Sequence, residues 1–109
     1  MKISKELAKG STAMLVLSVL AEEEMYGYRI IQEIAVRSEE VFSMNEGTLY
    51  PILHAMEKEG MLESYMAESE VGRKRRYYKI TPGGLLYLKE KKAEWRLFAA
   101  SVDKVIGEA

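Results

Sequence analysis

The chain has 109 residues, of which 48% are hydrophobic and 30% are charged, and its net charge is −1. These values fit one domain with an ample core, and they argue against a nonspecific nucleic-acid coat protein, which would be basic overall. Cysteine is absent, which excludes disulfides and thiolate metal sites, and no segment resembles a signal peptide or membrane-spanning helix. We therefore expect a cytoplasmic protein with no membrane partner.

The first part of the chain predicts two helices. Helical spacing begins at about Leu7, and residues 13–20 are apolar almost all round, so this helix should be buried on more than one side. Gly10 either allows a close backbone approach or is a weak point in the first turns. After a break at residues 22–25, Tyr26 and Gly27 open a second helix, and a polar connection follows over residues 36–43.

A third helix is predicted over residues 45–60, with an apolar stripe on one face. Asn45 is a good N-cap, and Gly60 can take the left-handed conformation that ends a helix. Pro51 falls in the second turn and removes one backbone hydrogen bond, a local irregularity of the kind found at functional sites. The face opposite the stripe carries Thr48, Tyr50 and His54, with Pro51 at its edge. We interpret this segment as the recognition helix of a helix-turn-helix.

Two strands with alternating side chains follow over residues 61–67 and 74–81, joined by a turn at 68–72. A hairpin in this position is the wing of a winged helix-turn-helix, and we use that name for it below. It carries a basic run that consists of Arg73, Lys74, Arg75, Arg76 and Lys79. Charge runs are usually solvated strand faces, but the place of this run beside a helix-turn-helix favours contact with DNA phosphates.

A long last helix should begin with Thr81 as N-cap and Pro82 at the first helical position. It carries an apolar seam in steps of three and four over about three heptads, with no further element in the chain to pack on. We therefore predict a symmetric homodimer through this helix. The expected interface residues are Leu85, Leu88, Trp95, Phe98, Val102 and Ile106.

The predicted fold is mainly α with a small β-hairpin: a winged helix-turn-helix over residues 1–81, followed by a C-terminal dimerisation helix over 82–109. Two stretches resemble the PadR family of transcriptional regulators. One reads Gly47-Thr48-Leu49-Tyr50-Pro51, and the other reads Gly72-Arg73-Lys74-Arg75-Arg76-Tyr77-Tyr78. The chain is similar to the short subfamily with one C-terminal helix, and the resemblance implies a dimer that binds double-stranded operator DNA, usually to repress.

The resemblance also implies an effector site, because some short members sandwich flat aromatic compounds between paired tryptophans. Trp95 matches that position, and the predicted ligand site comprises Trp95, Lys92, Ala99 and Met14. The cationic Lys92 would disfavour a cationic drug. The alternative interpretation of Trp95 is plain packing between the two subunits.

The predicted DNA contacts are Tyr28, Asn45, Thr48, Tyr50, Pro51, His54, Arg73, Lys74 and Arg75. Tyr50 either contacts DNA or packs over the wing, and of Tyr26 and Tyr28 we expect one in the core and one near phosphate. An enzyme is disfavoured because there is no cysteine, no second histidine and no glycine-rich phosphate loop, so no cofactor and no metal are expected. The alternative function is a winged-helix module that binds a partner protein instead of an operator.

Overall fold

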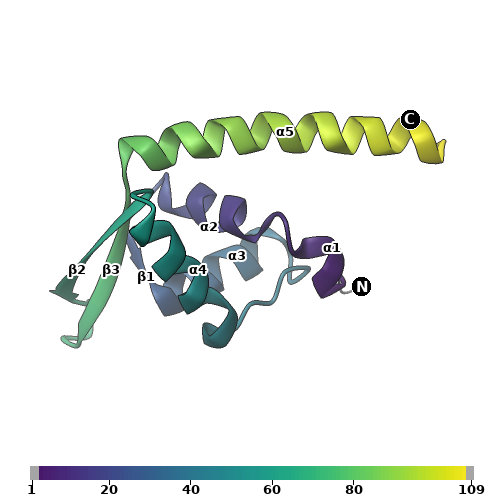
Figure 1. Ribbon diagram of the computed structural model, residues 1–109. Coiled ribbons are helices and arrows are strands. Elements are labelled where there is room, and N and C mark those ends of the chain that lie inside the picture. Colours follow the sequence, from purple (N-terminus) through teal and green to yellow (C-terminus); the bar gives the residue numbers. More distant parts are fainter. Residues whose placement is uncertain (1–2, 108–109) are drawn as a thin grey trace.

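The computed structural model describes residues 3–107 and contains five helices and three strands in that range. In chain order these are α1 (Lys5–Ala8), α2 (Thr12–Leu20), β1 (Met25–Tyr26), α3 (Gly27–Arg37), α4 (Glu46–Lys58), β2 (Leu62–Glu68), β3 (Lys74–Ile80) and α5 (Pro82–Ile106). Helices α2, α3 and α4 pack together, the sheet closes one end of them, and α5 runs along the opposite edge from the hairpin tip (Figure 1). This is the predicted winged helix-turn-helix with a long C-terminal helix.

One core holds the helices and the sheet together. Leu17, Ile30, Leu49 and Leu53 have no exposed surface, so α2, α3 and α4 all bury their apolar sides against one another. The sheet adds Met25, Leu62 and Tyr78 to the same cluster. Full burial of such side chains contributes roughly 1.5–3 kcal/mol each, which makes this cluster the main stabilising feature of the domain.

The sheet has three antiparallel strands in the order β1-β3-β2. The predicted strands are confirmed to within one residue at each end. The strand β1 was missed: it pairs Met25 with Tyr78 and Tyr26 with Tyr77, in a segment that the sequence predicted to be a break before a helix. Two residues are too few to leave an alternating pattern, so nothing in the sequence distinguished this strand from a loop.

The predicted first helix is divided. Ser4 caps α1 by accepting a hydrogen bond from the Leu7 amide, α1 ends after four residues, and α2 begins at Thr12. A Cβ added at Gly10 would have no atom within 4 Å, so a close backbone approach is the wrong explanation for this glycine. Gly10 instead lies in the turn between the two helices.

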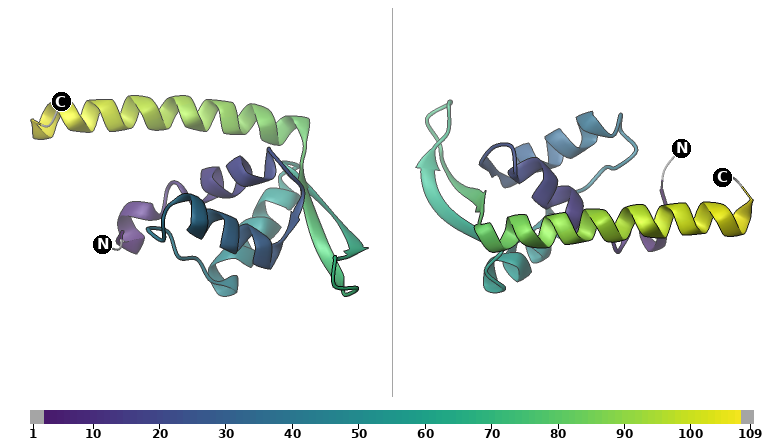
Figure 2. Two further views of the ribbon diagram at one scale, coloured as in Figure 1. Left: turned by 180° about the vertical axis from the view of Figure 1, so that it is seen from behind. Right: turned by 90° about the horizontal axis from the view of Figure 1, so that it is seen from above.

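Helix α5 has 25 residues, which corresponds to a length of about 37 Å. Its first part contacts α2 and the sheet, and its second part passes beyond the rest of the domain (Figure 2). None of the helices within residues 3–107 has the length and apolar character needed to cross a membrane.

Candidate nucleic-acid interface

The start of α4 is fixed by its cap. Asn45 is in an extended conformation, and its side-chain oxygen accepts a hydrogen bond of 2.9 Å from the Thr48 amide. The predicted apolar stripe is buried, and the predicted outer face is exposed, with Thr48, Pro51 and His54 all open to solvent. The irregular second turn at Pro51 is therefore on the accessible side of the helix.

Tyr50 was expected either to contact DNA or to pack over the wing. The side chain is 38% exposed, and its hydroxyl is directed at the start of α3, where a Cβ on Gly27 would lie 2.9 Å from it. Only glycine fits at position 27 without moving Tyr50. Tyr50 therefore packs against the start of α3, and its side chain stays partly accessible.

The tyrosines at the start of α3 also differ in position. Tyr28 is 49% exposed on the first turn of α3. Tyr26 is half-buried, but it stacks on the outer face of the sheet and is not in the core. The core residue of this segment is its neighbour Met25.

The members of the basic run lie on different sides of the wing. Arg73 and Lys74 are exposed at the tip, where the left-handed Gly72 closes the turn. On the inner face, Arg76 donates to the Ser64 hydroxyl (3.1 Å), which donates to Glu57 at the end of α4 (2.7 Å). On the outer face, the guanidinium of Arg75 lies 4.4 Å from the centre of the Tyr26 ring.

The acidic residues before β1 are used within the chain. Glu23 pairs with Arg29 at 2.8 Å, Glu22 pairs with Arg37, and Glu24 accepts a hydrogen bond from the Tyr65 hydroxyl. The hydrogen bond that Arg37 donates to Glu33, together with its contact with Glu22, raises the pKa of Arg37. These contacts connect the segment before β1 to α3 and to the wing.

Residues 16–90 match the transcriptional regulator PadR-like family. The chain belongs to the PadR family. The transcriptional regulator Rv3488 of Mycobacterium tuberculosis is 34% identical over 86 residues, which are 79% of this chain and 77% of that protein. A solved transcriptional regulator from Clostridium thermocellum is 36% identical, with a TM-score of 0.85 over 94% of this chain and 96% of that one. The PadR-like regulator BC4206 of Bacillus cereus is 32% identical, with a TM-score of 0.81 over 93% and 96% of the two chains.

These similarities assign the protein to DNA-binding transcriptional regulation and not to an enzyme class. Within residues 3–107 there is no group of three or more acidic or histidine side chains that could hold a metal ion. The single histidine, His54, is exposed on α4.

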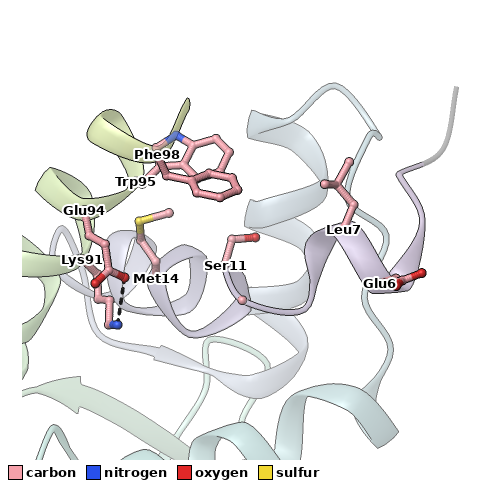
Figure 3. A pocket seen from close by; sticks show the side chains of 9 residues that line it. Glu6, Leu7, Ser11, Met14, Lys91, Glu94, Trp95 and Phe98 are labelled. Atoms are coloured by element: carbon pink, nitrogen blue, oxygen red, sulfur yellow. Dashed lines mark hydrogen bonds and ion pairs between the residues drawn. The ribbon is translucent and has the colours of Figure 1, made fainter. Parts of the chain in front are cut away.

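A cavity of about 440 Å³ lies between the N-terminal helices and α5 of this PadR-family chain. Trp95 and Phe98, with ring centres 6.0 Å apart, form one wall, and Met14, Ser11 and Leu7 lie opposite (Figure 3). Of the predicted ligand residues, Trp95 and Met14 line this cavity.

The other two predicted ligand residues, Lys92 and Ala99, do not line the cavity. The polar side of its wall is the pair of Lys91 and Glu94, whose charged groups are 3.1 Å apart, together with Glu6. The part of the wall formed by residues 6–11 was not predicted, because it depends on the turn that separates α1 from α2.

The exposed apolar side of α5 includes five of the six residues predicted for dimerisation: Leu85, Trp95, Phe98, Val102 and Ile106. Leu88 is the exception. It is only 4% exposed and belongs to the core of its own chain, so its assignment to the dimer seam is corrected. Leu97 is 70% exposed and was not in the predicted seam.

Proposed function

We propose that this PadR-family regulator is a cytoplasmic homodimeric repressor that binds double-stranded operator DNA through α4 and the wing. One observation carries the proposal: the exposed start of α4 and the basic hairpin tip lie at the same edge of the domain, opposite α5 (Figures 1 and 2). A dimer formed through α5 would leave this edge accessible in each of the two subunits. Two recognition helices about 34 Å apart would meet successive turns of the major groove.

The chemistry of α4 favours modest contacts with bases. Thr48 offers a hydroxyl group, Tyr50 offers the exposed part of its ring, His54 offers a ring nitrogen, and Pro51 can pack on a thymine methyl group. Amide groups at the helix start, behind the Asn45 cap, favour a phosphate. Helix α4 contains no arginine or glutamine, and its one lysine, Lys58, is in the last turn, far from the helix start. Its start is therefore poorly equipped for bidentate reading of guanine, and sequence-dependent DNA shape should contribute much of the specificity.

The wing supplies the electrostatic part of binding, together with Tyr28 near the backbone. With about three phosphate contacts per subunit, a dimer should show a slope of log K against log salt near −5. Replacement of Arg73 and Lys74 by alanine should weaken binding to all sequences alike and make this slope shallower. An unchanged slope would remove the wing tip from the mechanism.

The apolar side of α5 supports the dimer. Trp95 and Phe98 are each about half exposed in a single chain, and a second copy of α5 would cover them. Sedimentation at micromolar concentration tests this, and a monomer would contradict it.

The cavity beside Trp95 supports a small planar aromatic effector that releases the repressor. The single tryptophan of the chain is in its wall, so fluorescence reports on this site alone. Titration with a panel of planar aromatic compounds should quench the signal and weaken operator binding. If no compound has this effect, Trp95 is a packing residue and the effector proposal fails.

A gel-shift experiment with the DNA upstream of the protein's own gene tests the function as a whole. We expect tight, salt-sensitive binding of two chains per site, competed poorly by unrelated DNA, and loss of transcription from that promoter in vitro. Absence of binding at low salt would favour the alternative, a winged-helix module that recognises a partner protein.

A further inference from the structure

The cations of the wing are not equivalent. Within residues 3–107, the side chains of Arg73 and Lys74 make no hydrogen bond or ion pair, and both are exposed. Arg75 is half-buried, and its Nε has neither exposed surface nor a hydrogen-bond partner. Its guanidinium covers the Tyr26 ring at 4.4 Å. This contact holds the face of the guanidinium against the sheet, and the buried Nε withdraws one of its N–H donors from any external anion.

Tyr26 begins a row of aromatic rings across the outer face of the sheet. Its ring meets that of Tyr77 edge-on, with centres 5.5 Å apart, and Tyr77 stacks on Tyr65 at 5.7 Å. The Tyr65 hydroxyl donates to Glu24. The row joins β1, β3 and β2 in turn, so Arg75 extends a contact that already crosses the whole sheet.

Tyr26 is also the point where the sheet meets the helix-turn-helix. It is the N-cap of α3, and the next residue, Gly27, lies against Tyr50 of α4. A shift of Tyr26 would therefore move the start of α3 and disturb Tyr50. Through Tyr26, Arg75 connects the wing with both helices of the DNA-binding unit.

We propose that Arg75 is a positioning residue of the DNA-binding surface. By stacking on Tyr26 it sets the angle between the wing and α4, and Arg73 and Lys74 take the phosphates. This inference rests on the proposed DNA-binding function, and it gives Arg75 a different role from the phosphate contact predicted by the sequence.

The salt dependence of operator binding separates the two roles. Loss of one phosphate contact from each subunit makes the slope of log K against log salt shallower by about 1.8, which is the result expected for Arg73→Ala. Arg75→Ala should leave the slope unchanged and weaken binding about two- to fivefold at every salt concentration. A shallower slope in R75A, by the same amount as in R73A, would overturn the inference.

A double-mutant cycle tests the contact with Tyr26. Tyr26→Leu removes the aromatic face without changing charge, so R75A combined with Y26L should weaken binding no more than the stronger single variant. Additive losses would show that the two residues act separately. Arg75→Lys keeps the charge but loses the planar group, and full recovery of affinity in R75K would also contradict the positioning role.

The same variants distinguish failure of this inference from failure of the proposed function. Wild-type protein that shows no salt-sensitive operator binding refutes the function itself. Urea unfolding of the four proteins in the cycle then still measures the Arg75–Tyr26 contact without DNA, and additive shifts in midpoint would refute it. Arg75→Gln replaces R75A in the salt series if circular dichroism shows that R75A does not fold.

Discussion

Gly84→Ala should strongly destabilise this PadR-family regulator, although alanine normally favours a helix more than glycine does. A Cβ added at Gly84 would lie 2.2 Å from the Met61 carbonyl oxygen and 2.7 Å from Cγ1 of Ile80. The Met61 oxygen belongs to the backbone and already accepts a hydrogen bond of 3.0 Å from the Thr81 amide. It cannot move away without separating the start of α5 from the sheet.

The expected loss follows from two opposing effects. Overpacking of a rigid site costs about 1–3 kcal/mol or more, whereas Gly→Ala in a helix gains at most about 1 kcal/mol. Because the contact is far closer than van der Waals distance, the steric effect should win by about 2–3 kcal/mol. For a domain of this size, that loss lowers the melting temperature by roughly 10–20 °C.

The neighbouring glycine is the matched control. A Cβ at Gly83 would meet only the Gly60 oxygen at 3.6 Å and the Thr81 hydroxyl at 3.7 Å, both ordinary contacts. Gly83→Ala should therefore leave stability unchanged or raise it by up to about 1 kcal/mol. Thermal unfolding followed by circular dichroism, at one fixed protein concentration, compares the variants. Equal melting temperatures for G84A and G83A would refute the steric explanation.

Three further changes have predictable effects. Burial raises the pKa of Tyr78 above its ordinary value near 10, so the stability of its neutral form is fully present below about pH 10 and is lost above it. The free energy of unfolding of the wild type should fall between about pH 9 and about pH 11, and Tyr78→Phe should make this fall smaller. Tyr65→Phe should have a weaker effect. A pH profile that Tyr78→Phe leaves unchanged would contradict this explanation. Glu40 has a φ of 68°, a left-handed conformation that glycine adopts more easily than glutamate. Glu40→Gly should therefore raise the free energy of unfolding in urea by about 0.5–1 kcal/mol. A loss of stability would rule out backbone strain at this residue. Asn45→Ala removes the α4 cap and should lower the free energy of unfolding by about 1 kcal/mol, whereas Ser43→Ala should leave it unchanged.

The helices and the wing were predictable because their signals are local and repeated. The apolar stripe of α4 recurs over several turns, and Asn45 is in fact its cap. The strands of the wing alternate over seven residues each, and Thr81 caps α5 as predicted. Each of these features depends on residues that are close together in the sequence, so no knowledge of tertiary contacts was needed.

Two features depend on distant parts of the chain and could not be predicted from the sequence. Leu88 fits the heptad spacing of a dimer seam as well as any other seam residue, and only the packing of the first half of α5 on the domain assigns it to the core. Arg75 is indistinguishable from Arg73 in a basic run. Its contact with Tyr26 arises because β1 pairs with β3, a pairing with no sequence pattern of its own.

The joint between α4 and α5 determines how the proposed dimer and the DNA surface are related. The Thr81 hydroxyl donates to the Gly60 carbonyl at the end of α4 (2.6 Å) and accepts from the Gly84 amide in the first turn of α5 (3.0 Å). Gly84 has no room for a side chain against Met61, so α5 is in direct backbone contact with the short segment that follows α4. A change in the angle between two paired α5 helices would therefore be carried to α4 with no flexible linker to absorb it. This makes the distance between the two recognition helices depend on how α5 pairs, which is where a compound bound beside Trp95 would act.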